Sequence, residues 1–244
     1  MVGGATPVLR RLAAPAALLA VLVAYYLWHE SLPKLSTWGD VAWLSVVLVP
    51  AVFALVYLAL PLRTSKWLLP AGLGLLLAGF ALQWLGVGLA GNFAKLGATT
   101  ALGFWFVSFF ETAAWVALVA LIVPWVDAYS VWRGPTHTIV TEQPHVFSAL
   151  AFAFPVPGAN GVAKLGLPDL FFFALFLAAC PRFGLRTRLT WLTMALSFGA
   201  TIALAVWWNL DGLPALPLLA LGFLAPNADL LWRAFRSRDQ ALRK

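Results

Sequence analysis

The sequence is poor in cysteine and in charge. It contains one cysteine, Cys180, and charged residues make up 10% of its 244 residues, against about 25% in ordinary soluble domains. A single cysteine excludes a disulfide within the chain and any metal site that needs several thiolates. The regular alternation of apolar and polar residues that marks an outer-membrane barrel is also missing. The low charge argues against a soluble domain of this length.

Apolar residues dominate what is present. They make up 62% of the chain, and the mean hydropathy is +0.89. Many apolar runs approach the ~20 residues that a helix needs to cross ~30 Å of hydrocarbon. Thirteen tryptophans suit anchoring at the level of the lipid headgroups. The composition therefore predicts an all-α, polytopic helical membrane protein, with residues 1–244 forming one transmembrane domain.

Eight apolar segments are expected to span the membrane. The first follows Arg10 and Arg11, as in a signal peptide, but it ends in YYLW without a small-residue cleavage site, which favours an uncleaved span. Residues 90–132 could form one span, giving seven in all, but their length favours two, with a turn at Glu111. We expect scaffold helices in 12–89, the helices of the site in 93–232, and an extramembrane loop at 134–163. The expected spans are 12–28, 41–60, 67–89, 93–110, 112–133, 165–180, 189–208 and 213–232.

The distribution of basic residues supports eight spans. With eight, twelve of the 16 Lys and Arg residues lie on the side of both termini, whereas seven spans give ten on the better side. Short cytoplasmic loops carry an excess of Lys and Arg. The sequence therefore predicts that both termini are cytoplasmic and that the 134–163 loop lies on the opposite side. This distribution also explains the net charge of +7 without a nucleic-acid partner.

Two carboxylates, Asp127 and Asp169, fall inside the expected spans or at their buried mouths. A lone Asp in a span costs roughly 2.5–3.5 kcal/mol on insertion scales and is usually functional. Pro124 precedes Asp127 by three residues, and Pro168 directly precedes Asp169. Irregular backbone at membrane depth is tolerated only where it is buried in protein or lines a wet cavity. The two aspartates are therefore the candidate site.

Two neighbouring carboxylates in a medium of low dielectric constant cannot both ionise easily, so they share a proton. The ionised member can then activate a water, while the protonated member polarises a carbonyl group, as in aspartic proteases. The same residues also suit a proton-coupled transporter or a structural role. Transporters often contain an inverted repeat, and none is found between the two halves of this chain.

Three motifs in the second half carry a family resemblance. Residues 127–137 (DAYSVWRGPTH) resemble a region in which an aspartate ends an apolar helix and a short basic connection with Gly and Pro follows, and residues 111–115 (ETAAW) resemble the entry to that helix. Residues 164–169 (KLGLPD) resemble a Gly-x-Gly-Asp signature, and residues 213–217 (LPALP) resemble a Pro-Ala-Leu motif that opens the last helix. In this order, over residues 93–232, they resemble the presenilin and signal peptide peptidase group of intramembrane aspartyl proteases, including its prokaryotic presenilin-like members.

The resemblance implies a presenilin-like bundle in which the eight spans correspond to the second through ninth of the family's nine. It implies hydrolysis of peptide bonds within transmembrane segments, without a cofactor or metal. The implied partners are transmembrane protein substrates and the lipid bilayer, and the implied location is a prokaryotic cell membrane. With the 134–163 loop outside the cytoplasm, the orientation of the chain resembles that of signal peptide peptidase. The implied site consists of catalytic Asp127 and Asp169, supported by Gly166, Leu167, Pro168, Pro214, Ala215 and Leu216.

Two positions depart from the family pattern. Val126 stands where the family has a Tyr before its first aspartate, and Pro168 replaces the second Gly of the signature. Glycine permits close backbone approach, whereas proline fixes φ and lacks an N–H donor. A catalytically inactive relative is therefore an alternative within the family.

Other features predict less. His137, Glu142 and His145 match no recognised spacing of metal ligands. Residues 146–157 are too short to span, and are expected to pack on the bundle, re-enter the membrane or form an edge strand that pairs with substrate. Lys164 is expected to extend to the membrane interface, with pairing to Asp169 as the alternative.

The charge distribution makes a testable prediction about topology. A reporter fused after Lys244 is expected to lie in the cytoplasm, because an even number of spans puts both termini on the basic side. A fluorescent protein is therefore expected to fluoresce there, and a phosphatase that needs export is expected to be inactive. The measurement compares a phosphatase fusion with a fluorescent-protein fusion at the same position. An extracytoplasmic signal at Lys244 would overturn the eight-span topology.

Overall fold

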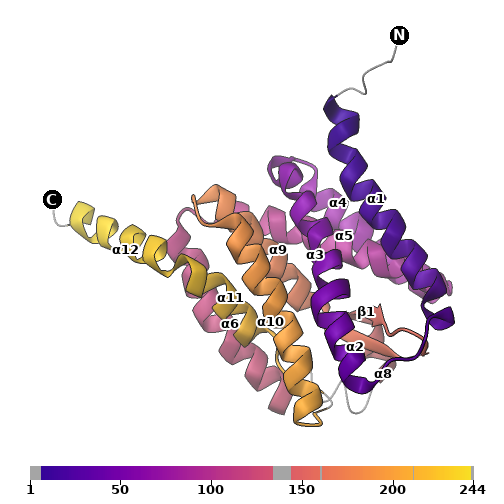
Figure 1. Cartoon of the computed structure of the whole chain (residues 1–244). Coiled ribbons are helices and arrows are strands. Elements are labelled where there is room, and N and C mark those ends of the chain that lie inside the picture. The colour runs from indigo at the N-terminus through magenta and orange to yellow at the C-terminus, as the bar shows by residue number, and fades with distance from the viewer. Residues whose placement is uncertain (1–6, 134–143, 160, 211, 243–244) are drawn as a thin grey trace.

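The computed structural model describes residues 7–133, 144–159, 161–210 and 212–242. The described residues form a bundle of helices with one two-stranded sheet beside it (Figure 1). The helices are α1 (Pro7–Trp28), α2 (Thr37–Trp43), α3 (Val49–Leu58), α4 (Leu68–Trp84), α5 (Gly88–Phe106), α6 (Ala113–Arg133), α8 (Pro144–Ala149), α9 (Leu167–Arg182), α10 (Thr187–Trp207), α11 (Leu216–Leu224) and α12 (Ala228–Leu242). A π-helical turn (Leu44–Leu48) joins α2 to α3, and a 3-10 turn (Ala225–Asn227) joins α11 to α12.

Among the described residues, four helical stretches are long and apolar enough to cross a membrane. Each coincides with an expected span, and the surface carries large exposed apolar side chains, including Trp84 at 87% and Trp125 at 80%. Soluble monomers rarely expose extended apolar surface, so this surface is suited to lipid. The four stretches are Ala13–Ser31, Thr37–Thr64, Ala113–Arg133 and Thr187–Trp207.

Helix boundaries near the site differ from those expected from the sequence. The expected 67–89 segment ends at Trp84, because the chain turns at Gly86, whose φ of +79° favours glycine. Helix α5 then begins at Gly88 instead of residue 93, which places Lys95 two turns inside the helix and buries it, with 2% of its surface exposed.

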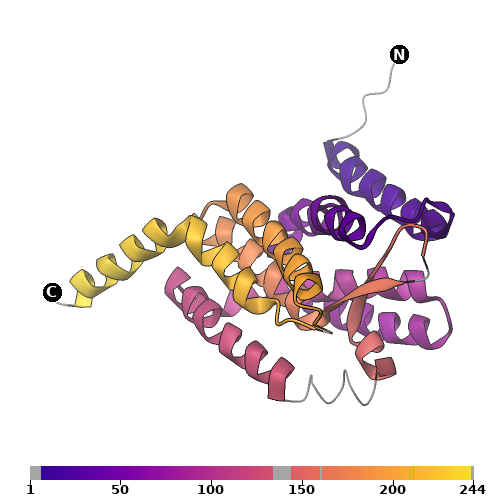
Figure 2. The same ribbon diagram turned by 60° about the horizontal axis from the view of Figure 1, so that its bottom comes forward.

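One short hairpin lies within the otherwise helical architecture that the sequence predicts. Strand β1 (Ala151–Pro155) pairs antiparallel with β2 (Val162–Gly166), and Ala153 lies opposite Lys164. The helix expected to begin at residue 165 begins at Leu167, because Leu165 and Gly166 belong to β2. An apolar run does not reveal by itself where a strand ends and a helix begins. The hairpin contacts α5 and α9, at one end of the bundle (Figure 2).

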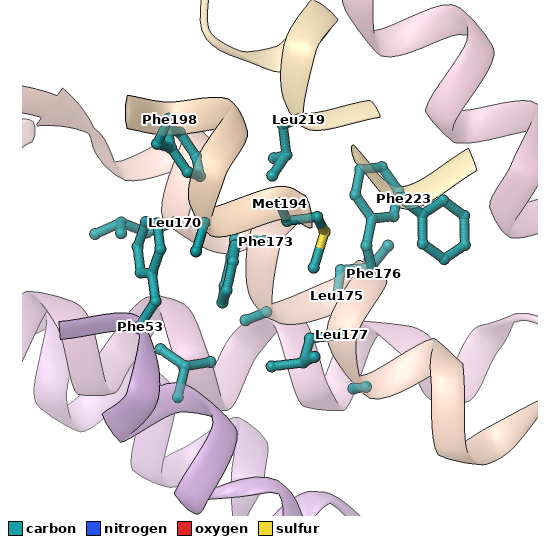
Figure 3. Packing of buried hydrophobic residues seen from close by; sticks show 14 of the residues in the cluster. Phe53, Leu170, Phe173, Leu175, Phe176, Leu177, Met194, Phe198, Leu219 and Phe223 are labelled. Atoms are coloured by element: carbon teal, nitrogen blue, oxygen red, sulfur yellow. The ribbon is translucent and has the colours of Figure 1, made fainter. Parts of the chain in front are cut away.

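Helix α9 lies at the centre of the bundle, in contact with α5, α10 and α11. Every side chain from residue 173 to 180 is fully buried. The ring of Phe173 stacks on Phe53 of α3 at a centroid distance of 4.1 Å, and Phe176 stacks on Phe223 of α11 at 4.8 Å (Figure 3). The 16 residues of α9 extend only about 24 Å. Neighbouring helices, instead of lipid, surround this short helix.

A glycine allows α5 and α9 to approach closely. A Cβ atom added to Gly103 would lie 2.7 Å from the carbonyl oxygen of Phe171 and 2.8 Å from Cβ of Ala174. The nearest obstacles thus include backbone atoms, which cannot rotate away. Small residues at such crossings let membrane helices pack backbone against backbone.

Gly103→Ala is therefore expected to destabilise the protein by about 1–3 kcal/mol, the usual cost of overpacking. Gly74→Ala on α4 is the control, because nothing lies within 4 Å of the added Cβ and Ala favours a helix over Gly by about 1 kcal/mol. Thermal unfolding in detergent measures both variants. Equal melting temperatures for Gly103→Ala and wild type would contradict this account of the α5–α9 contact.

Candidate active site

Asp127 joins α6 to the beginning of α11. Its Oδ2 atom accepts a hydrogen bond from the backbone N–H of Leu216 at 3.0 Å, and the N–H of Ala215 also donates to this carboxylate. Leu216 is the first residue of α11. The first N–H groups of a helix have no partner inside the helix, and they attract negative charge. Asp127 therefore satisfies donors that α11 itself cannot.

Asp169 is the third residue of α9, and Gly166 is the N-cap of this helix. The backbone N–H of Gly166 donates to the Asp169 carboxylate, which is the backward-reaching half of a capping box. A Cβ on Gly166 would lie 3.1 Å from Oδ2 of Asp169. Glycine at this position thus leaves room for the carboxylate.

Pro168 occupies the second position of α9, where the N–H has no acceptor inside the helix. The start of the helix therefore tolerates proline at the position where the resembled signature has glycine. Val126, the other departure from the pattern, is 61% exposed and does not line the cavity described below. Neither residue distorts the backbone that holds the aspartates.

Both aspartates line one cavity of about 980 Å³. Their side chains are partly exposed, and the carboxyl groups lie close enough to repel each other electrostatically. The cavity is bounded by α4, α5, α6, α8, α9, α10, both strands and the segment 212–215, with apolar side chains such as Phe80, Phe154 and Phe198 on its walls. The two acids thus share one largely apolar cavity.

The structure places all eight candidate residues of the site around this cavity. Gly166, Leu167, Pro168, Pro214 and Ala215 line it together with the aspartates. Leu216 is buried and contributes its backbone N–H to Asp127. The three motifs, which are far apart in the sequence, therefore meet at one place.

Two other sequence-based expectations have different outcomes. Lys164 donates to Oγ of Ser148 at 2.7 Å and so ties β2 to α8. His137 and Glu142 lie outside the described residues, as does the side chain of His145. The expectation about metal binding at these three residues therefore lies outside the part of the chain that the structure describes. Within the described part of the chain, no three His, Cys, Asp or Glu residues are grouped as metal ligands.

Sequence reasoning missed a polar cluster behind the hairpin. Nζ of Lys95 donates to Oε1 of Gln83 at 2.9 Å and to the carbonyl oxygens of Ala149 and Ala151 at 3.2 and 2.6 Å. Asn92, one turn earlier on α5, bonds to Ala153. The available signal was a lysine in an apolar span, since such residues usually have a function and a partner.

No family model matches this chain, and no curated protein matches it. The chemistry of the site must therefore be inferred from its geometry. Two acids on one cavity, each held by backbone amides, can bind a water between them and exchange a proton.

The Asp127–Leu216 contact makes a prediction about stability. Asp127→Leu is expected to destabilise the protein by about 1–3 kcal/mol, because the N–H of Leu216 would lose its partner inside the protein. Asp127→Asn keeps an acceptor oxygen and is expected to remain near wild type. Thermal unfolding in detergent measures both, with Glu111→Leu, an exposed carboxylate at the entry to α6, as control. Equal losses for Asp127→Asn and Asp127→Leu would contradict the assigned contact.

Proposed function

We propose that this chain is an intramembrane aspartyl protease that hydrolyses peptide bonds within transmembrane segments of other proteins. The observation that supports it most directly is the pair Asp127 and Asp169, which come from different helices and line one cavity. The N–H of Leu216, in the segment that resembles a Pro-Ala-Leu motif, also donates to Asp127. No cofactor enters the proposed reaction.

In the proposed reaction, one ionised aspartate removes a proton from a water as the water oxygen attacks the peptide carbonyl carbon. The protonated aspartate donates a hydrogen bond to the carbonyl oxygen as negative charge develops there. The tetrahedral intermediate collapses when its C–N bond breaks, and the leaving nitrogen takes the proton that the first aspartate removed from the water. The pair, rather than either acid alone, carries the shared proton.

The cavity is suited to a peptide segment. All five residues of β2 line it, and among the described residues no strand pairs with the outer side of β2. A substrate helix that unwinds at membrane depth needs partners for its freed N–H and C=O groups. Pairing with β2 supplies them. The edge strand that serves substrate is thus β2, whereas residues 146–157 contain β1, which packs on the bundle.

The proposal includes the membrane topology. The chain is an integral protein of a prokaryotic cell membrane, with eight spans in a presenilin-like bundle and both termini cytoplasmic. Its substrates are proteins with transmembrane segments. The four long apolar helices and the exposed apolar surface support membrane insertion.

A second candidate, a catalytically inactive relative, is favoured by one observation. Each aspartate satisfies backbone N–H groups at the start of a helix, Asp127 for α11 and Asp169 for α9. These contacts would give both residues a purely structural role. The isosteric Asn variants separate the two candidates, because they keep acceptor oxygens but cannot share a proton as two acids do.

Purified wild-type protein in liposomes is expected to cleave a model substrate with one transmembrane segment. Asp127→Asn and Asp169→Asn are each expected to lower the rate by about 100-fold or more, since a general acid or base contributes at least that factor. Mass spectrometry of the products measures the rate and the cleavage position. Glu111→Gln is the control and is expected to cleave at the wild-type rate. It removes a carboxylate that lies about four helical turns before Asp127.

Cleavage at the wild-type rate by either Asn variant would rule out the dyad. Absence of cleavage by the wild-type protein, together with unchanged thermal stability of both Asn variants, would favour the structural role.

A further inference from the structure

Side chains from two helices occupy the outer edge of β1. The carbonyl oxygens of alternate residues each accept a side-chain hydrogen bond there. That of Ala151 accepts from Nζ of Lys95 at 2.6 Å, and that of Pro155 accepts from the hydroxyl of Tyr25 at 2.8 Å. The carbonyl of Ala153, between them, accepts from both Tyr26 and Asn92. Helices α1 and α5 thus take the place of a third strand.

Asn92 imitates a neighbouring strand most closely. Its Nδ2 donates to the carbonyl oxygen of Ala153 at 2.9 Å, and its Oδ1 accepts from the N–H of the same residue at 2.9 Å. A side-chain amide carries the same donor and acceptor as a peptide group. One asparagine therefore satisfies both backbone groups that Ala153 directs away from β2.

The orientation of Ala153 fixes that of β2. Because Ala153 directs its N–H and C=O toward Asn92, its pairing with Lys164 is of the kind without direct backbone hydrogen bonds in an antiparallel ladder. The N–H and C=O of Lys164 then point away from β1. All five residues of β2 also line the cavity that contains the aspartates.

Lys95 is a costly residue to bury, since only 2% of its surface is exposed and its three bonded acceptors are all uncharged. A protonated lysine has three N–H donors, so these acceptors use all of them. Close packing of α4 on α5 brings Gln83 into reach: a Cβ on Gly91 would lie 2.9 Å from the carbonyl oxygen of Gly79. The backbones are therefore packed tightly where the lysine is held.

We propose that Tyr25, Tyr26, Asn92 and Lys95 are positioning residues that hold β1 so that the free edge of β2 stays aligned with Asp127 and Asp169. This inference rests on the proposed function for its effect on catalysis. Residue Gly166 ends β2, and Asp169 follows three residues later. A shift of the hairpin would therefore move the register of a paired substrate relative to the acids.

Amide hydrogen exchange of residues 151–155, in the full chain in lipid nanodiscs, tests the positioning role without any assay of activity. Asn92→Leu and Lys95→Met are each expected to raise the exchange rate there by roughly tenfold, because strand groups lose bonded partners. Thr100→Val is the matched control, because Thr100 is also buried on α5 but bonds only to the carbonyl of Leu96 in its own helix. Exchange in α9 should stay unchanged.

A milder variant serves if Asn92→Leu or Lys95→Met fails to fold. Tyr25→Phe with Tyr26→Phe removes two hydroxyl donors and keeps the ring contacts with Trp43 and Phe93. Its exchange rate in 151–155 should rise severalfold. Unchanged exchange in every variant that folds would overturn the proposal, whatever the activity.

Cleavage of the single-span substrate gives the second measurement. The positioning variants are expected to raise KM at least threefold and to spread the cut over neighbouring peptide bonds, while Thr100→Val keeps one site. Faster exchange with unchanged KM and one cleavage site would also overturn the proposed alignment. If the variants exchange faster but the wild-type protein cleaves nothing, the four residues still hold β1 in place, and the protease function is rejected.

Discussion

The polar groups of this protein depend on finding partners within an apolar bundle. Inside a membrane no water satisfies a backbone N–H, so each donor exposed by a helix start or a strand edge needs an acceptor from the protein. Asp127 serves the start of α11, Asp169 serves the start of α9, and Asn92 serves the edge of β1. The residues proposed to carry the chemistry are thus also residues that hold the bundle together.

This coupling of stability and chemistry explains the geometry of the cavity. Helix α6 packs mainly against α11 and α12 and touches α9 little, so Asp127 is held in place largely through α11. Asp169 is placed by α9, which is packed on all sides, and by the hairpin that leads into it. Two separately anchored acids therefore face one space without either helix having to bring them together directly.

Much of the site could be predicted from the sequence, because its signals are chemical. Asp127 and Asp169 are conspicuous as carboxylates in apolar segments, and the prolines beside them mark helix irregularities. The apolar runs also revealed the four long helices. An edge strand is one of the expectations for residues 146–157, which contain β1, but an apolar run does not show where β2 ends and α9 begins. The burial of Lys95 could not be predicted, because its partners lie on α4, α8 and β1, and tertiary contacts of this kind leave no local pattern.

The shortness of α9 also sets the depth of the proposed active site. With a length of about 24 Å, α9 falls about 6 Å short of a ~30 Å hydrocarbon layer. If its Arg182 end is level with one membrane surface, Asp169 at the other end lies in a recess below the opposite surface. Water for the proposed hydrolysis then has only a few ångströms to travel, and the thickness of the surrounding bilayer becomes a determinant of how readily it arrives.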